Sequence, residues 1–208
     1  MLLDPTQAGT AASLSLLGVT AIALHKGALA DAEIQAREPT GSEGYRLVAK
    51  YPHEQSIWYP DGASVWQVTA APAPALVTLP GGFDKPHLGA DGVAVYPLIS
   101  SAGVGVLNFT ARSAGLVRLV FDATPPPGAK TATLRVADSK SEQAFPLAGR
   151  TPISVLVAIP RGQSQLLLKT DPPPTSAADA ILISIPRAER ASGAAALHAD
   201  LVSPDPGF

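Results

Sequence analysis

The chain has 208 residues and no cysteine, which excludes disulfides, thiolate metal sites and cysteine nucleophiles. Charged side chains are also few, at 15%, and 15 basic against 17 acidic residues leave a net charge of −2. This balance offers no electrostatic basis for binding nucleic acid or an anionic membrane surface. Because hydrophobic residues make up 46%, the composition excludes a disordered chain as well.

Long hydrophobic runs are missing too. No segment approaches the roughly 18–20 apolar residues that cross a bilayer, and residues 1–5 lack the basic and apolar regions of a signal peptide. We therefore expect the chain as given to be soluble, and its high hydrophobic content indicates a piece of a larger protein.

Proline and glycine, by contrast, are abundant, with 21 and 18 residues, and favour short strands over long helices. In residues 1–70 proline and glycine separate short predicted elements that together form a small α+β unit. Residues 5–17 predict a short helix with Asp4 as its cap and Gly18 as its stop, and the apolar run 19–24 is typical of a strand buried on both faces. We expect a second short helix over residues 27–37 and a strand over 45–51. A hairpin with its turn at 59–62 is expected over residues 56–68.

An alanine–proline segment at 70–75 marks the expected boundary of this unit. Beyond it, apolar and polar residues alternate with period two, most clearly over 153–159, and each run ends in a proline or glycine cluster. Such runs without intervening helices indicate an antiparallel sandwich or barrel. We predict a mainly β chain: a jelly-roll-like antiparallel β-sandwich at 76–187, preceded by the α+β unit at 1–70 and followed by a C-terminal tail at 188–208.

Two stretches resemble a known family. The run LLGVTAIALH at 16–25 is similar to the segment that follows the last transmembrane helices of bacterial C-superfamily glycosyltransferases, which use polyprenyl-phosphate sugar donors. The runs GVAVYPL at 92–98 and VAIPRGQSQLLL at 157–168 resemble the carbohydrate-binding-module-like jelly rolls at the tails of such proteins. The resemblance implies an extracytoplasmic, non-catalytic domain tethered to the membrane in the full-length protein, because that superfamily carries its catalytic acids between transmembrane helices.

No arrangement of side chains in the sequence is typical of catalysis. Gly103-Val104-Gly105-Val106 lacks the third glycine and the helix of a phosphate-binding loop and predicts a strand, and no nucleophile elbow is present. The histidines do not have the paired spacing of a zinc site and are scattered at His25, His53, His87 and His198. We expect no catalytic residue in this chain.

Two kinds of binding site remain as candidates. Asp84 and Asp91 bracket a loop before a strand, where a jelly-roll module could hold a structural Ca²⁺. Glycan binding uses exposed rings, and the candidates for it are Trp58, Trp66 and Tyr96. For the two tryptophans, packing between the two units is the stronger expectation.

These observations predict that the chain is an accessory extracytoplasmic domain of a membrane glycosyltransferase-like protein, on the periplasmic or cell-wall side. It would recognise glycan or serve as a structural platform, and its partners would be its own membrane domain and cell-envelope glycan, not nucleic acid. The alternative is a structural or protein-interaction module of a cell-envelope protein without sugar binding. An enzyme ranks third.

Overall fold

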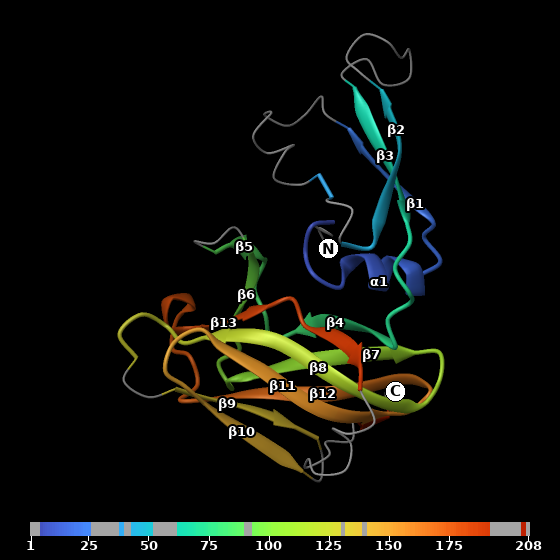
Figure 1. Cartoon of the computed structure of the whole chain (residues 1–208). Coiled ribbons are helices and arrows are strands. Elements are labelled where there is room, and N and C mark those ends of the chain that lie inside the picture. Colours follow the sequence, from blue (N-terminus) through green and yellow to red (C-terminus); the bar gives the residue numbers. More distant parts are fainter. Residues whose placement is uncertain are drawn as a thin grey trace. The chain divides into compact units, whose positions relative to one another are not determined.

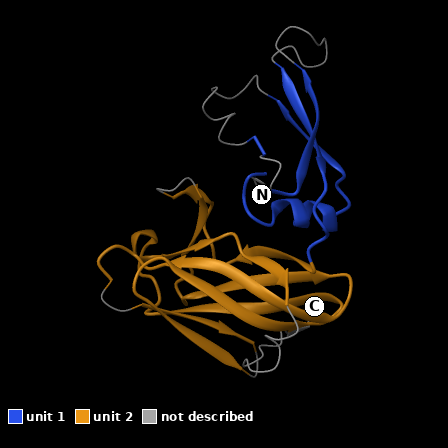
Figure 2. Cartoon of the chain, in the orientation of Figure 1, with its two compact units in different colours: residues 1–73 blue, residues 74–208 orange. Residues whose placement is uncertain are grey.

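The computed structural model describes residues 5–25, 38–39, 43–51, 62–89, 93–129, 132–138, 141–191 and 205–206. The chain forms two compact units, residues 1–73 and 74–208 (Figure 2). The division falls inside the alanine–proline segment. Among the helices in these described ranges, none combines the length and apolar character needed to cross a membrane.

The described part of unit 1 contains a three-stranded antiparallel sheet packed on one short helix. The sheet has the order β1–β3–β2, with β1 at Ala21–His25, β2 at Tyr45–Tyr51 and β3 at Ala63–Val68. The helix α1, Thr10–Leu16, packs Ala11 and Leu14 against Tyr45 and Trp66 of the sheet. This small cluster is the core of unit 1.

The ends of α1 are set by two glycines. The helix begins at Thr10 rather than at residue 5, because Gly9 adopts a left-handed φ of 84° that does not continue a helix. At the other end Gly18 has φ 83°, and its N–H donates to the Ser15 carbonyl while the Val19 N–H donates to Leu14. This pair of bonds is a Schellman motif, so the predicted stop at Gly18 is confirmed.

The expectation of a strand buried on both faces over 19–24 is wrong. β1 is an edge strand that exposes Ala21, Ala23 and His25 on one face and turns Ile22 and Leu24 toward the core. An apolar run made partly of alanine is compatible with either position, since alanine at an exposed site costs little. The predicted helix over 27–37 and most of the turn at 59–62 lie outside the described residues.

Unit 2 consists of two antiparallel sheets packed face to face (Figure 1). The β12 sheet has the order β10–β9–β12–β7–β4, with β15 also paired to β12. The β8 sheet has the order β11–β8–β13–β6–β5, with β14 also paired to β8. Their strands are β4 Ala75–Gly81, β5 His87–Leu88, β6 Ala94–Leu98, β7 Val104–Ala111, β8 Gly115–Thr124, β9 Ala132–Ala137, β10 Glu142–Leu147, β11 Thr151–Ile159, β12 Gly162–Asp171, β13 Ile181–Ser184, β14 Arg187–Arg190 and β15 Asp205–Pro206, with a 3-10 turn at Ala177–Asp179.

Eight connections between consecutive described strands cross from one sheet to the other: β4 to β5, β6 to β7, β7 to β8, β8 to β9, β10 to β11, β11 to β12, β12 to β13 and β14 to β15. This exchange is that of a jelly-roll-like sandwich, so the predicted fold class is confirmed. The alternation that predicted it has the expected physical basis, because every second side chain enters a single core. That core includes Leu107, Phe109, Leu166 and Leu168 from the β12 sheet and Val117, Leu119, Phe121, Ile153, Val155 and Val157 from the β8 sheet.

Strands β14 and β15 extend the sandwich past residue 187, inside the segment expected to be a tail. β14 pairs with β8, aligning Ala188 with Leu119 in the core. β15 adds a short pairing to β12 at Ser164 and Gln165. The described parts of the C-terminal segment are therefore strands of the two sheets.

Candidate functional site

Five uncharged polar side chains lie together on the outer face of the β12 sheet. Their sequence neighbours, such as Leu107 and Leu166, are fully buried in the core, so the alternation of a strand turns the five outward. They come from β4, β7 and β12, which are adjacent in the sheet. We name this surface the polar face and define it as Thr78, Asn108, Thr110, Gln163 and Gln165.

The strand register places these side chains in two adjacent rows. Asn108 lies between Thr78 of β4 and Gln165 of β12, and Thr110 is paired with Gln163 in the next row. Opposed residues in an antiparallel pair project from the same face, with Cβ atoms about 4.5–5.5 Å apart. Two amides and a hydroxyl are therefore presented side by side across three strands, with a third amide and a second hydroxyl next to them.

The chemistry of the polar face is that of neutral hydrogen bonding. Amides and hydroxyls both donate and accept, and none of the five side chains carries a charge. Asn108 and Gln165 are half-buried, and the Asn108 Oδ1 atom is buried with no hydrogen-bond partner. The face is suited to a neutral ligand rich in hydroxyl groups.

An apolar row borders the polar face. Leu167 of β12 is aligned with Val106 of β7 on one side and with Ala137 of β9 on the other. Val106 and Leu167 are half-buried. Ala137 is fully buried, so Val106 and Leu167 provide the surface on which the C–H groups of a sugar ring can pack.

Beyond the apolar row lies a cluster of four charged side chains, which we name the ion-pair cluster: Arg135, Glu142, Lys169 and Asp171. The Arg135 guanidinium lies 2.7 Å from Glu142 Oε1 and 3.4 Å from Asp171 Oδ2, and Lys169 Nζ lies 3.3 Å from Glu142 Oε2. The hydrogen bond from Arg135, with a further one from Lys169, lowers the pKa of the Glu142 carboxyl. The hydrogen bond to Glu142 in turn raises the pKa of Arg135. Two cations and two anions neutralise each other here.

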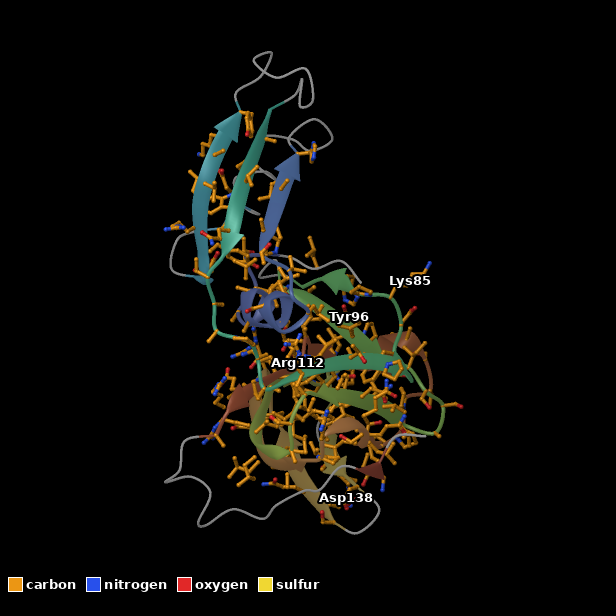
Figure 3. All side chains as sticks on the ribbon, turned by 90° about the vertical axis from the view of Figure 1, so that its right-hand side faces the viewer. Lys85, Tyr96, Arg112 and Asp138 are labelled. Atoms are coloured by element: carbon orange, nitrogen blue, oxygen red, sulfur yellow. The ribbon has the colours of Figure 1, made fainter. Side chains whose placement is uncertain are left out.

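Tyr96, a predicted glycan-binding residue, lies on β6 in the other sheet (Figure 3). It is aligned with Ile183 of β13 and is half-buried, and this burial raises the pKa of its hydroxyl. Leu88 of the neighbouring strand β5 is 63% exposed. Tyr96 thus has a partly accessible ring, on a different sheet from the polar face.

Trp66 is not available as a stacking surface. Only 7% of the residue is exposed, its ring packs with Ala11, Leu14 and Tyr45, and its Nε1–H donates to Ser64 Oγ at 3.0 Å. Contacts within the core of unit 1 therefore explain the burial of Trp66. Trp58 lies outside the described residues.

The predicted calcium residues are described only in part. Asp84 is exposed, and its Oδ1 accepts the backbone N–H of the adjacent Lys85, labelled in Figure 3, at 2.7 Å. Asp91 lies outside the described residues, as do His53 and His198. His25 and His87 are on exposed strand positions in different units. Within the described ranges no three histidine, aspartate or glutamate side chains are grouped as metal ligands.

The polar face was not predicted from the sequence. The alternation marks Asn108, Thr110 and Gln165 as polar positions of strands, which is the only signal available. Residues 78, 108 and 165 belong to three distant segments, and only the register of β4, β7 and β12 aligns them.

Neither a protein-family model nor a curated protein matches this sequence. Among solved structures, a family 35 carbohydrate binding module from an environmental isolate is 15% identical with a TM-score of 0.38, covering 55% of this chain and 93% of that chain. The family 35 module of Cellvibrio japonicus Abf62 is 16% identical with a TM-score of 0.34, covering 57% of this chain and 99% of that one. The isomalto-dextranase of Arthrobacter globiformis T6 is 15% identical with a TM-score of 0.38, covering 63% of this chain but only 26% of that enzyme.

Proposed function

We propose that unit 2 is a non-catalytic glycan-recognising module that binds a polysaccharide on the polar face. The observation that carries this proposal is the alignment of the uncharged residues Thr78, Asn108 and Gln165 across three strands, with Thr110 and Gln163 beside them. Recognition of a sugar requires groups that match many hydroxyls, each of which both donates and accepts. Amide and hydroxyl side chains meet this requirement without the desolvation cost of a charge.

The rigid placement of these groups also supports binding. All five are on strands, and the residues between them, Phe109 and Ser164, are buried, with Phe109 in the core. A site on regular strands loses less conformational entropy on binding than a site on loops. The apolar row of Val106 and Leu167 would contact the ring carbons of the same ligand.

In the full-length protein, the module would be an extracytoplasmic accessory domain of a membrane glycosyltransferase-like protein. The resemblance of residues 16–25 to the segment after the last transmembrane helices of that superfamily supports this context. The partners would be the membrane part of the protein and a glycan of the cell envelope.

A protein-interaction module without sugar affinity is the second candidate. Exposed apolar side chains on β2 of unit 1 favour it, with Leu47 at 40% and Val48 at 61% exposure. Apolar surface of this kind is a feature of protein contacts. With this second function, unit 1 and not unit 2 would bind the partner.

The test is binding of the purified chain to a panel of soluble neutral polysaccharides, measured by affinity electrophoresis and titration calorimetry. We expect binding to at least one polymer and a loss of affinity of about tenfold or more in Asn108→Ala/Gln165→Ala, since each lost hydrogen bond contributes about 0.5–1.5 kcal/mol.

The matched control removes two polar side chains from the outer face of the other sheet, in Thr124→Ala/Ser154→Ala. It should bind like the wild type, and circular dichroism should show both variants folded. Absence of binding to every polymer, or an equal loss in the control, would contradict the proposal.

A further inference from the structure

We infer that the polar face selects uncharged polysaccharides over carboxylated or sulfated ones, and that Glu142 and Asp171 determine this selectivity by engaging Arg135 and Lys169. The inference rests on the proposed function of the polar face. It adds a substrate class and the residues that set it.

The ion-pair cluster is continuous with the polar face along β12. Gln165, Leu167 and Lys169 alternate on the same side of this strand, and Lys169 is aligned with Arg135 of β9. At about 3.3 Å per residue, Gln165 and Lys169 are roughly 13 Å apart along the strand. A polysaccharide that lies along β12 from the polar face and over the apolar row therefore reaches the ion-pair cluster.

The two cations at this end are already neutralised. Glu142 contacts both of them, at 2.7 Å from Arg135 and 3.3 Å from Lys169, and Asp171 adds a second partner for Arg135 at 3.4 Å. The formal charges of the four side chains sum to zero. No net positive charge is left to attract an acidic sugar.

An acidic ligand would meet a cost that a neutral ligand avoids. Its carboxylate could reach Arg135 or Lys169 only by displacing Glu142 or Asp171, and before that it would approach two like charges. Sugar hydroxyls, in contrast, can hydrogen-bond to the outer atoms of an ion pair without breaking it. The cluster thus acts against acidic ligands and is neutral toward uncharged ones.

Removing the two acids should reverse this selectivity. In Glu142→Gln/Asp171→Asn the pairs are lost while side-chain size is kept, which leaves Arg135 and Lys169 as an exposed cationic patch at the end of the binding surface. We expect the variant to gain at least about tenfold in affinity for an acidic polymer. The gain should disappear at high salt, because exposed charges are screened.

The experiment uses a matched pair of ligands, namely a neutral polysaccharide bound by the wild type and the same polymer oxidised to carboxylates at C6. Polygalacturonate serves as a further acidic probe. The control, Asp122→Asn/Glu189→Gln, removes the same two charges from the β8 sheet, where Asp122 pairs with Arg150 at 2.6 Å and Glu189 with Arg187 at 2.8 Å. If the double variant is unstable, Glu142→Gln alone suffices, since Glu142 contacts both cations.

The expected result is that the wild type and the control prefer the neutral polymer, whereas Glu142→Gln/Asp171→Asn binds the oxidised one. A wild type that prefers the oxidised polymer, or a control that gains as much as the variant, would overturn the inference while leaving glycan binding intact. A wild type that binds no polymer of either kind would overturn the proposed function itself.

Discussion

Phe83 lies against the backbone of Gly105 and joins the segment after β4 to the beginning of β7. A Cβ atom added at Gly105 would lie 2.5 Å from the Phe83 ring and 3.2 Å from a methyl group of Leu98. The glycine is therefore required by close packing in the core, not by an unusual backbone angle. Gly103, in contrast, has a positive φ of 66° and precedes the strand, which begins at Val104, so the glycine-rich run Gly103-Val104-Gly105-Val106 forms a strand as predicted.

Replacing this glycine should destabilise the sandwich. We expect Gly105→Ala to lower the free energy of unfolding by about 1–3 kcal/mol, because the added methyl group must displace the partly buried Phe83 ring. Urea unfolding followed by far-UV circular dichroism measures the change.

Gly115→Ala is the matched control, since a Cβ at Gly115 at the exposed start of β8 meets no atom within 4 Å. Its effect should stay within about 0.5 kcal/mol. Equal effects of the two substitutions would show that the Phe83 contact does not limit residue 105.

At the scale of elements, β12 organises the functional surface. It pairs with β7 along one edge and with β9 along the other, so its outward side chains connect the polar face, the apolar row and the ion-pair cluster. The inward side chains Leu166 and Leu168 hold the same strand in the core. One ten-residue strand therefore supplies both the rigidity and much of the chemistry of the proposed site.

The ion pairs that join β9, β10 and β12 should make stability depend on pH. The pKa of Glu142 is lowered in the folded chain by Arg135 and Lys169. Its stabilising contribution is therefore complete above the ordinary glutamate pKa of 4.5 and is lost as the pH falls through the lower folded-state pKa. We expect the stability difference between wild type and Glu142→Gln to be constant near neutral pH and to vanish in acid.

Thermal unfolding at a series of pH values tests this expectation. The difference should be small at neutral pH, below about 1 kcal/mol, and should shrink with added salt, because the pairs are exposed. Thr133→Ala on the same face carries no titratable group, so its difference from the wild type should not change with pH. A Glu142→Gln difference that grows in acid would contradict the assignment.

At the scale of the whole molecule, the two units differ in their aromatic residues. Both tryptophans are in unit 1, where Trp66 is part of the core, and Tyr96 is the sole tryptophan or tyrosine in the sequence of unit 2. The polar face contains no aromatic side chain. Tryptophan emission is therefore a reporter for unit 1 and can distinguish the two proposed locations of glycan binding.

We expect a polysaccharide that binds at the polar face to leave the wavelength and intensity of tryptophan emission unchanged. The measurement is a fluorescence titration run in parallel with calorimetry, with Asn108→Ala/Gln165→Ala as the reference with weakened binding at the polar face. An emission change that persists in this variant would place the binding site in unit 1, at the tryptophans that the sequence offers as candidates.

The sequence alone determined the parts of this structure that depend on local periodicity and backbone preference. The alternation over Ile153 to Ile159 predicts β11, and Gly18 marks the end of α1, because a strand repeats every two residues and glycine readily adopts positive φ. The apolar run over 19–24 does not predict how β1 is buried. An apolar residue can be buried, but it is buried only where another element packs on its face of the sheet, and in β1 only the face of Ile22 and Leu24 packs on the core.

The tertiary structure alone decided which polar residues meet. Thr78, Asn108 and Gln165 alternate with core residues as any exposed strand position does, and nothing local distinguishes them. Strand order and register bring them into one row and place Glu142 beside both Arg135 and Lys169. The register of these strands is fixed by packing of their inner side chains in the core. The outer side chains are aligned as a consequence of that register, so the sequence does not show which of them will be neighbours.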